Sequence, residues 1–266
     1  MEIFLRPLDT PLGSISFAIV CFVVNRINRI NRINRFNRIM HFKYFFLLLP
    51  LMAILLFAFQ IAPKPTRVVF FGDSITEAGV NPGGYIAQLR DSLAVLKKDK
   101  KYELVGAGIG GNKIYDLYLR LEEDVLARKP KVVVLYVGVN DVWHRHTFGT
   151  GTDADKFQKF YLALIQKFQQ KGIQVIACTP ACIGERSAGQ NRMDAELDLF
   201  SAIIRSVAAE KKIPLCDFRQ AFQDYFNQNN PENLESGILT TDGVHLNEKG
   251  NKLVADMLLV ELNGIR

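Results

Sequence analysis

The chain has 266 residues, 48% of them hydrophobic and 23% charged, a composition that supports a large buried core and excludes a disordered protein. Its formal net charge of +6 would by itself suggest a nucleic-acid or membrane partner. Residues 1–66 hold eight of the 33 Lys and Arg and two of the 27 Asp and Glu, which leaves 25 of each sign from Arg67 onward. Because the surplus lies before Arg67, we predict no nucleic-acid-binding surface on the rest of the chain.

Residues 25–39 repeat the triplet Asn-Arg-Ile, with Phe36 at one of the isoleucine positions. A step of three residues falls about 60° short of a full helical turn, so the apolar side chains spread around a helix without forming a face. On a strand they would alternate between its two sides. We therefore expect residues 1–39 to be a low-complexity leader without a fold of its own. The alternative is that translation begins at Met40 and this leader is not made.

Residues 40–62 start with a short basic stretch and continue with nineteen uncharged residues, Tyr44 to Ala62. Such a run spans a bilayer as a helix at about 1.5 Å per residue, and secretory signal peptides have the same pattern. Pro63 follows the run and no small-x-small pair precedes it, so an uncleaved membrane anchor is favoured over a cleaved signal. Either way we expect a short linker at residues 63–66 and an exported domain, anchored to a membrane or released into the periplasm or outside the cell.

From residue 67 to residue 266, apolar runs of strand length alternate with helical stretches. In the clearest helical stretch, Arg192–Lys211, apolar residues recur at spacings of three or four. This alternation predicts an α/β domain with a five-stranded parallel sheet covered by helices on both faces. The expected strands are Arg67–Phe71, Tyr102–Val105, Val132–Val137, Gln174–Cys178 and, more weakly, Ile213–Cys216.

Polar clusters follow the ends of these strands, where ligands bind in such folds. They are residues 72–76 (GDSIT), 106–112 (GAGIGGN), 138–141 (GVND) and, near the C-terminus, 242–245 (DGVH). A serine hydroxyl becomes a good nucleophile when a base takes its proton, and that base needs a partner to fix its tautomer. Asp242 and His245, three residues apart, can meet in a turn. The other histidines beyond the apolar run, His144 and His146, are expected in a loop after Asn140.

These four blocks, in this order, resemble the SGNH or GDSL family of serine esterases and lipases over nearly all of residues 67–266. The resemblance implies a three-layer, flavodoxin-like fold and a Ser-His-Asp triad. It places the nucleophile at Ser74, the base at His245 and the orienting carboxylate at Asp242. It also implies that Gly111 and Asn140 join the Ser74 backbone N–H in the oxyanion hole.

The second block departs from the family pattern, because the usual asparagine is Gly106 here. The departure leaves open which residue holds the loop at residues 106–112 in place. It does not affect Gly111, the expected donor. The same block spells G-x-G-x-x-G, the dinucleotide fingerprint, but the acidic residues that follow lie in a helical stretch and not at a strand end. Ser74 to Glu77 also fits a helix capping box. The joint occurrence of four blocks favours catalysis over both interpretations.

No metal or cofactor is implied, and Cys178, Cys182 and Cys216 have no metal-ligand spacing. We expect these three as buried free thiols, with a Cys178–Cys216 disulfide as the alternative. The function predicted is hydrolysis of carboxylic esters: short acyl esters, O-acetylated carbohydrate or lysophospholipid. The alternative is a surface-anchored carbohydrate-binding protein with the same fold and no turnover.

Overall fold

The computed structural model describes residues 64–264, together with residues 22, 25–32, 35, 44, 50 and 52 of the N-terminal segment. The chain divides into two units, Met1–Pro63 and Lys64–Arg266. Most of the expected signal or anchor at 40–62 and most of the leader therefore lie outside the described residues. Among the described residues, no helix is both long enough and apolar enough to cross a membrane.

Residues 25–32, within the Asn-Arg-Ile repeat, are helical. Their apolar side chains nevertheless form no buried face, since Ile27 and Ile30 are both 51% exposed. Whether residues 1–39 form a leader without a fold of its own stays a prediction.

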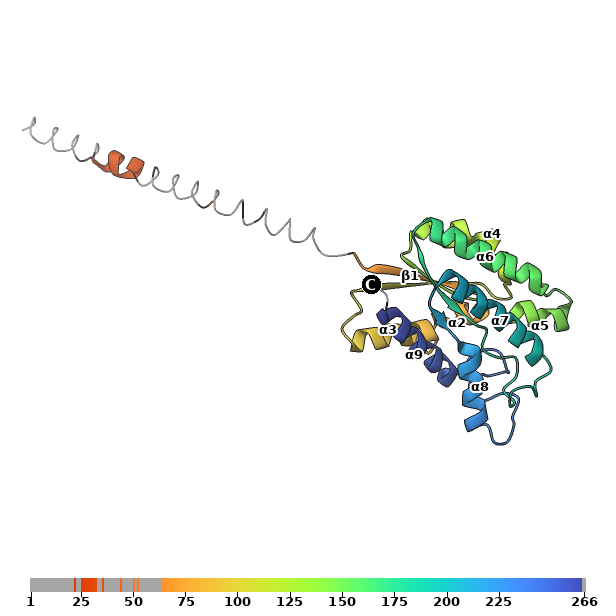
Figure 1. Cartoon of the computed structure of the whole chain (residues 1–266). Helices are drawn as coiled ribbons and strands as arrows, with labels where there is room; N and C mark the ends of the chain where they lie inside the picture. Colours follow the sequence, from red (N-terminus) through yellow and green to blue (C-terminus); the bar gives the residue numbers. More distant parts are fainter. Residues whose placement is uncertain are drawn as a thin grey trace, which may run out of the picture. The chain divides into compact units, whose positions relative to one another are not determined.

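The second unit is built on a five-stranded, all-parallel sheet in the order β2-β1-β3-β4-β5 (Figure 1). This is the flavodoxin-like order, so the predicted fold class is confirmed. The central strand β3 is buried along its whole length, as its run of apolar residues predicts. The strands are β1 (Thr66–Gly72), β2 (Tyr102–Gly108), β3 (Val132–Tyr136), β4 (Gln174–Cys178) and β5 (Leu215–Cys216).

Helices cover both faces of the sheet (Figure 1). Helices α3 and α9 pack side by side on one face, whereas α4, α6 and α7 form the layer on the other. In α6, apolar residues at helical spacing, such as Phe157, Leu164 and Phe168, are buried against the sheet. The helices are α2 (Ser74–Gly79), α3 (Tyr85–Val95), α4 (Ile114–Asp124), η1 (Leu126–Arg128), α5 (Val139–Phe148), α6 (Ala154–Gln170), α7 (Asp194–Lys211), α8 (Phe218–Asn229) and α9 (Glu248–Gly264).

Candidate active site

Ser74 is the first residue of helix α2, directly after strand β1. The N-cap of this helix is Asp73, whose carboxylate accepts a hydrogen bond of 3.0 Å from the N–H of Ile75. The capping role considered for Ser74 therefore belongs to its neighbour. The Ser74 hydroxyl faces His245 instead, with Oγ 3.0 Å from Nε2.

Asp242 and His245 come from the loop between α8 and α9, and His245 meets Ser74 across 171 residues of sequence. His245 Nδ1 lies 2.7 Å from Asp242 Oδ2. The other carboxylate oxygen accepts hydrogen bonds from the backbone N–H groups of Val244 and His245. Burial would raise the pKa of Asp242, but these hydrogen bonds outweigh it and hold the pKa below its ordinary value. The three side chains thus form a continuous hydrogen-bonded chain.

The loop that carries Asp242 is held together by backbone hydrogen bonds between its own residues. Thr240 and Leu246 form an isolated antiparallel bridge, and the N–H of Thr241 donates to the carbonyl of His245 at 2.8 Å. At its turn Gly243 has φ +93°, a conformation that favours glycine. The residues between Asp242 and His245 are therefore held in one short turn that brings the two side chains together.

Glu185, in the segment between β4 and α7, forms hydrogen bonds with this loop. The sequence analysis did not identify it. Its carboxylate is fully buried and accepts hydrogen bonds from the backbone N–H groups of Ile238, Leu239 and Thr240 and from the Thr240 hydroxyl. The Thr240 hydroxyl oxygen in turn accepts from the N–H of Gly243 at 2.9 Å. A buried carboxylate thus fixes the chain just before the aspartate.

The loop after β2, which carries Gly111, runs beside Ser74, and Asn140 is hydrogen-bonded to that loop. A Cβ added to Gly110 would be 3.9 Å from the Cβ of Ser74, so the loop after β2 runs next to the hydroxyl. In this loop Gly111 has φ +74°. Asn140, the second residue of α5, donates from Nδ2 to the carbonyl of Asn112 at 3.2 Å. The third block is therefore tied to the second.

Two buried carboxyl groups, Asp73 and Asp141, lie directly beside Ser74 and Asn140 in the sequence. Burial raises the pKa of each from 3.8 to about 7. The Asp141 carboxylate accepts hydrogen bonds from the N–H of Ile114 at 3.2 and 3.3 Å, which connects α5 to the start of α4. Both groups change charge near neutral pH.

His144 and His146 lie in helix α5, so the expectation that they stand in a loop is wrong. Val139–Phe148 forms ten residues of helix that end at Gly149, in the left-handed conformation typical of a helix end. The ring of His146 bonds to Glu196 at 2.7 Å, while burial lowers the pKa of His144. The histidine that contacts Ser74 is His245.

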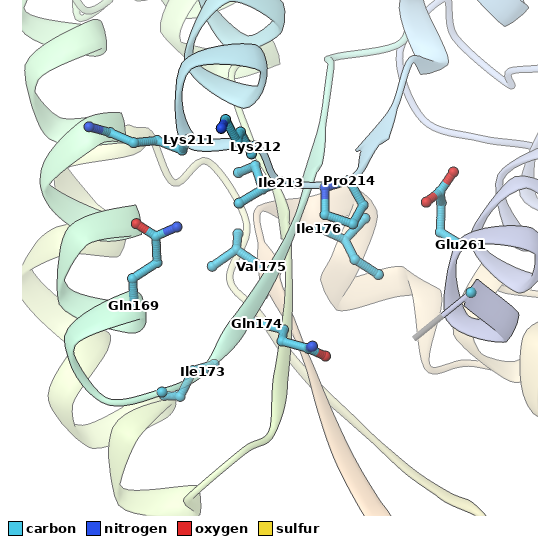
Figure 2. A pocket seen from close by; sticks show the side chains of 12 residues that line it. Gln169, Ile173, Gln174, Val175, Ile176, Lys211, Lys212, Ile213, Pro214 and Glu261 are labelled. Carbon is cyan, nitrogen blue, oxygen red and sulfur yellow. The ribbon is translucent and has the colours of Figure 1, made fainter. Parts of the chain in front are cut away.

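Two hollows differ in their relation to this site. A cleft of about 450 Å³ borders Asp242 and is lined by Trp143, Arg186, Gln190 and Arg192, among others. A groove of about 610 Å³ lies at the amino ends of β4 and β5 (Figure 2), whereas Ser74 follows the carboxyl end of β1. Of these two hollows, the cleft at Asp242 is the one next to the hydrogen-bonded chain.

The three cysteines of the second unit, Cys178, Cys182 and Cys216, are buried and free. This agrees with the interpretation as buried thiols and not with a Cys178–Cys216 disulfide. Burial raises the pKa of Cys178 and Cys182, as expected for thiols in apolar surroundings. Within the described part of the chain, no three His, Cys, Asp or Glu side chains cluster as metal ligands would.

Comparison with known proteins places these features in a family. Residues 70–253 match the GDSL-like Lipase/Acylhydrolase family. An acetylxylan esterase of Geobacillus stearothermophilus is 26% identical over 211 residues, which cover 74% of this chain and 93% of the relative. The uncharacterised lipoprotein YqeF of Bacillus subtilis is 25% identical over 207 residues, which cover 70% and 85% of the two chains.

A solved structure gives the same result at higher identity. The crystal structure of the acetyl xylan esterase AlAXEase is 56% identical to this chain, with a TM-score of 0.72 over 73% of this chain and 98% of that one. The similarity thus spans nearly the whole of that protein and, together with the family match, covers the fold described above. The chain belongs to the GDSL-like lipase/acylhydrolase family and is a carboxylic ester hydrolase.

Proposed function

We propose that this protein removes acetyl groups from O-acetylated carbohydrate by means of a Ser74–His245–Asp242 triad. The observation that carries the proposal is the hydrogen-bonded chain of these side chains, with distances of 3.0 and 2.7 Å, at the carboxyl end of a parallel sheet. The substrate class is supported by the similarity to acetylxylan esterases, one of them 56% identical.

In the first half of the reaction, Ser74 Oγ attacks the ester carbonyl while His245 Nε2 accepts the hydroxyl proton. Asp242 stabilises the imidazolium that forms. The Ser74 and Gly111 N–H groups and the Asn140 amide hold the negative oxygen of the tetrahedral intermediate. His245 then gives its proton to the leaving sugar oxygen, and an acetyl-serine remains.

In the second half, His245 takes a proton from a water molecule, which attacks the acetyl-serine. Collapse of the second tetrahedral intermediate releases acetate and returns the proton to Ser74. Both halves use the same base and the same oxyanion donors, so no metal or cofactor is needed for the balance of atoms and charge.

The composition of the cleft beside Asp242 supports the proposal that the alcohol part of the ester is a sugar. Its lining combines one aromatic ring, Trp143, with hydrogen-bonding side chains such as Arg186, Gln190 and Arg192. Trp143 packs edge-on against His245, with 6.0 Å between ring centroids. The lining also includes the apolar residues Ile183, Met193 and Val244. An aromatic ring beside hydrogen-bonding side chains can contact both the face and the hydroxyl groups of a sugar.

We also propose that the domain acts outside the cytoplasm. The support is the uncharged run from Tyr44 to Ala62, which has the length of a signal or anchor, and the similarity to a lipoprotein. N-terminal sequencing of the natively produced protein, recovered from membrane and soluble fractions, tests this. A chain that starts at Met1 or another residue before Met40 would also exclude translation from Met40.

Acetate release from acetylated xylo-oligosaccharide, compared with hydrolysis of p-nitrophenyl acetate, butyrate and octanoate, tests the substrate class. We expect activity on the oligosaccharide and a steep fall with acyl length, with no activity in Ser74→Ala. Preference for the octanoate ester or for a lysophospholipid would exclude the acetyl-carbohydrate assignment. Failure to hydrolyse any of these esters would support a carbohydrate-binding protein without turnover.

A further inference from the structure

Arg120, on helix α4, donates hydrogen bonds to both ends of the segment 107–112. This segment leads from β2 to Gly111 and is called the oxyanion loop below. Nη2 donates to the backbone carbonyls of Gly72 at 2.8 Å and Ala107 at 3.0 Å. Nε donates to Asn112 Oδ1 at 2.7 Å. The side chain is only 14% exposed, so these hydrogen bonds are largely shielded from water.

The three acceptors belong to the parts that make up the site. Gly72 ends β1, two residues before Ser74, and Ala107 stands near the end of β2. Asn112 follows Gly111 and accepts the Asn140 amide at its own backbone carbonyl. One guanidinium group therefore connects the segment that leads to the serine with both ends of the oxyanion loop.

The guanidinium plane is itself fixed. Nη1 forms an ion pair with Asp124 at 2.7 Å, one turn along the same helix. The central carbon lies 4.6 Å from the ring centroid of Phe71, within the range of a cation–π contact. Arginine presents five donors in a rigid fork, whereas the ammonium group of lysine is a single flexible point. Lysine at position 120 could not reproduce this set of hydrogen bonds.

The contacts of Arg120 lie next to Gly106, the position at which the family resemblance implies an asparagine. A Cβ at Gly106 would lie 2.4 Å from Cγ1 of Val80, a distance at which one of them must move. Support of the loop from this position is therefore blocked by Val80. Arg120 contacts the loop from helix α4 instead, one residue away from Gly106 at the Ala107 carbonyl.

We propose that Arg120 is a positioning residue that holds the Gly111 N–H and the Asn140 amide in place relative to Ser74, in the role left open by Gly106. This inference rests on the proposed oxyanion hole. Arg120 does not touch the reacting atoms itself, so its loss should lower turnover and leave substrate binding and the Ser74–His245–Asp242 chain unchanged.

The test compares kcat and KM for p-nitrophenyl acetate in wild type, Arg120→Met and Arg120→Lys. Removal of an oxyanion donor costs about 10² to 10³ in turnover, and we expect misplaced donors to cost somewhat less, about 10-fold to 100-fold in kcat for both variants. KM should stay within about twofold and the pH profile should keep its shape. Arg67→Met is the matched control, because Arg67 joins the far ends of β1 and β2 through Glu103 at 2.9 Å.

A double-mutant cycle with Asn140→Ala separates positioning from general destabilisation. If Arg120 acts through the oxyanion donors, its loss should cost much less in the Asn140→Ala background than in wild type. Equal costs in both backgrounds, or a wild-type kcat in folded Arg120→Met, would overturn the proposal. If Arg120→Met does not fold, Asn112→Ala decides by the same criteria, because it removes only the loop acceptor. An inactive wild type would instead count against the proposed function.

Discussion

The Asp242 carboxylate makes two kinds of hydrogen bond with the same stretch of chain as His245. One oxygen lies 2.7 Å from His245 Nδ1, and the other accepts the backbone N–H groups of Val244 and His245 at 3.0 and 2.8 Å. The backbone bonds fix the turn and the ring bond fixes the imidazole tautomer. In the proposed mechanism, Nε2 is thereby left free to accept the Ser74 proton.

Asp242→Asn should therefore lower kcat/KM by about 10⁴, as the loss of tautomer control does in serine hydrolases, while the protein stays folded. Hydrolysis of p-nitrophenyl acetate and a thermal melt on the same sample check both parts. A variant with an unchanged rate would show that Asp242 and His245 are not the working pair. His144 and His146 on α5 would then have to be reconsidered.

The pH dependence follows from the same pair. A histidine must be neutral to act as a base, so kcat/KM for a neutral ester should rise with pH through one ionisation and then level off. The lowered pKa of Asp242 keeps this carboxylate ionised throughout that range. Measurement of kcat/KM from about pH 5 to 9, which brackets histidine titration, tests this ascending limb of the profile. A flat profile would contradict a histidine base.

Asp73 needs a control in that experiment, because burial raises its pKa to about 7 and it precedes the nucleophile. In Asp73→Asn the side-chain oxygen can still accept the Ile75 N–H bond. The ascending limb should persist in this variant. Its disappearance would assign the limb to Asp73.

Asn140→Ala should lower turnover by about 10² to 10³ if its amide contacts the oxyanion. Asn140→Asp should be slower still, because a carboxylate beside the developing negative charge adds repulsion. The matched control is Asn229→Ala, which removes an exposed asparagine amide that also donates to a backbone carbonyl. Wild-type rates in either Asn140 variant would mean that the residue serves only to link α5 to the loop at Asn112.

Glu185→Gln should lower both stability and turnover. The amide nitrogen that replaces one carboxylate oxygen faces backbone N–H groups of Ile238, Leu239 or Thr240, and an unsatisfied buried donor costs about 1–3 kcal/mol. In a domain of about 200 residues each kcal/mol lowers Tm by about 2–4 °C. Glu122→Gln, at an exposed ion pair with Lys167, should change neither quantity. A Glu185→Gln variant with wild-type Tm would exclude the bracing role.

Asp141 gives a prediction for stability against pH. Its folded pKa of about 7 lies above the ordinary 3.8, so its contribution to stability is complete below about pH 4 and is lost as pH rises through 7. Each pH unit between the two values corresponds to about 1.4 kcal/mol. The Tm of Asp141→Asn relative to wild type should therefore rise between pH 5 and pH 8. A constant difference would mean that Asp141 does not titrate in this range.

The sequence predicts well what depends on local pattern. Strand β3 is a run of Val, Leu and Tyr that is buried on both faces, and its limits agree to within one residue. Asp242 and His245 are close in sequence, so their contact follows from a turn. The order of the strands, and with it the meeting of Ser74 and His245 across 171 residues, required the family resemblance.

What the sequence did not reveal depends on distant contacts. Arg120 bonds to Gly72, 48 residues away, and Glu185 bonds to Thr240, 55 residues away. Each looks like an ordinary surface charge in the sequence, and no periodicity identifies the backbone groups that it contacts. The sequence did not predict helix α5 for a different reason. Its histidines and threonine have modest helix propensity, and its buried residues are confined to the first turn.

The most direct test of the central claim is covalent labelling of Ser74. A fluorophosphonate reacts only with a serine that a neighbouring base activates, and peptide mass spectrometry identifies the labelled residue. We expect label on Ser74 alone and inactivation in proportion to labelling. Ser74→Ala should lose label and esterase activity with an unchanged Tm, whereas Ser206→Ala, at an exposed serine of α7, should keep both. Label on another serine, or hydrolysis by Ser74→Ala at the wild-type rate, would contradict the assignment of Ser74 as the nucleophile.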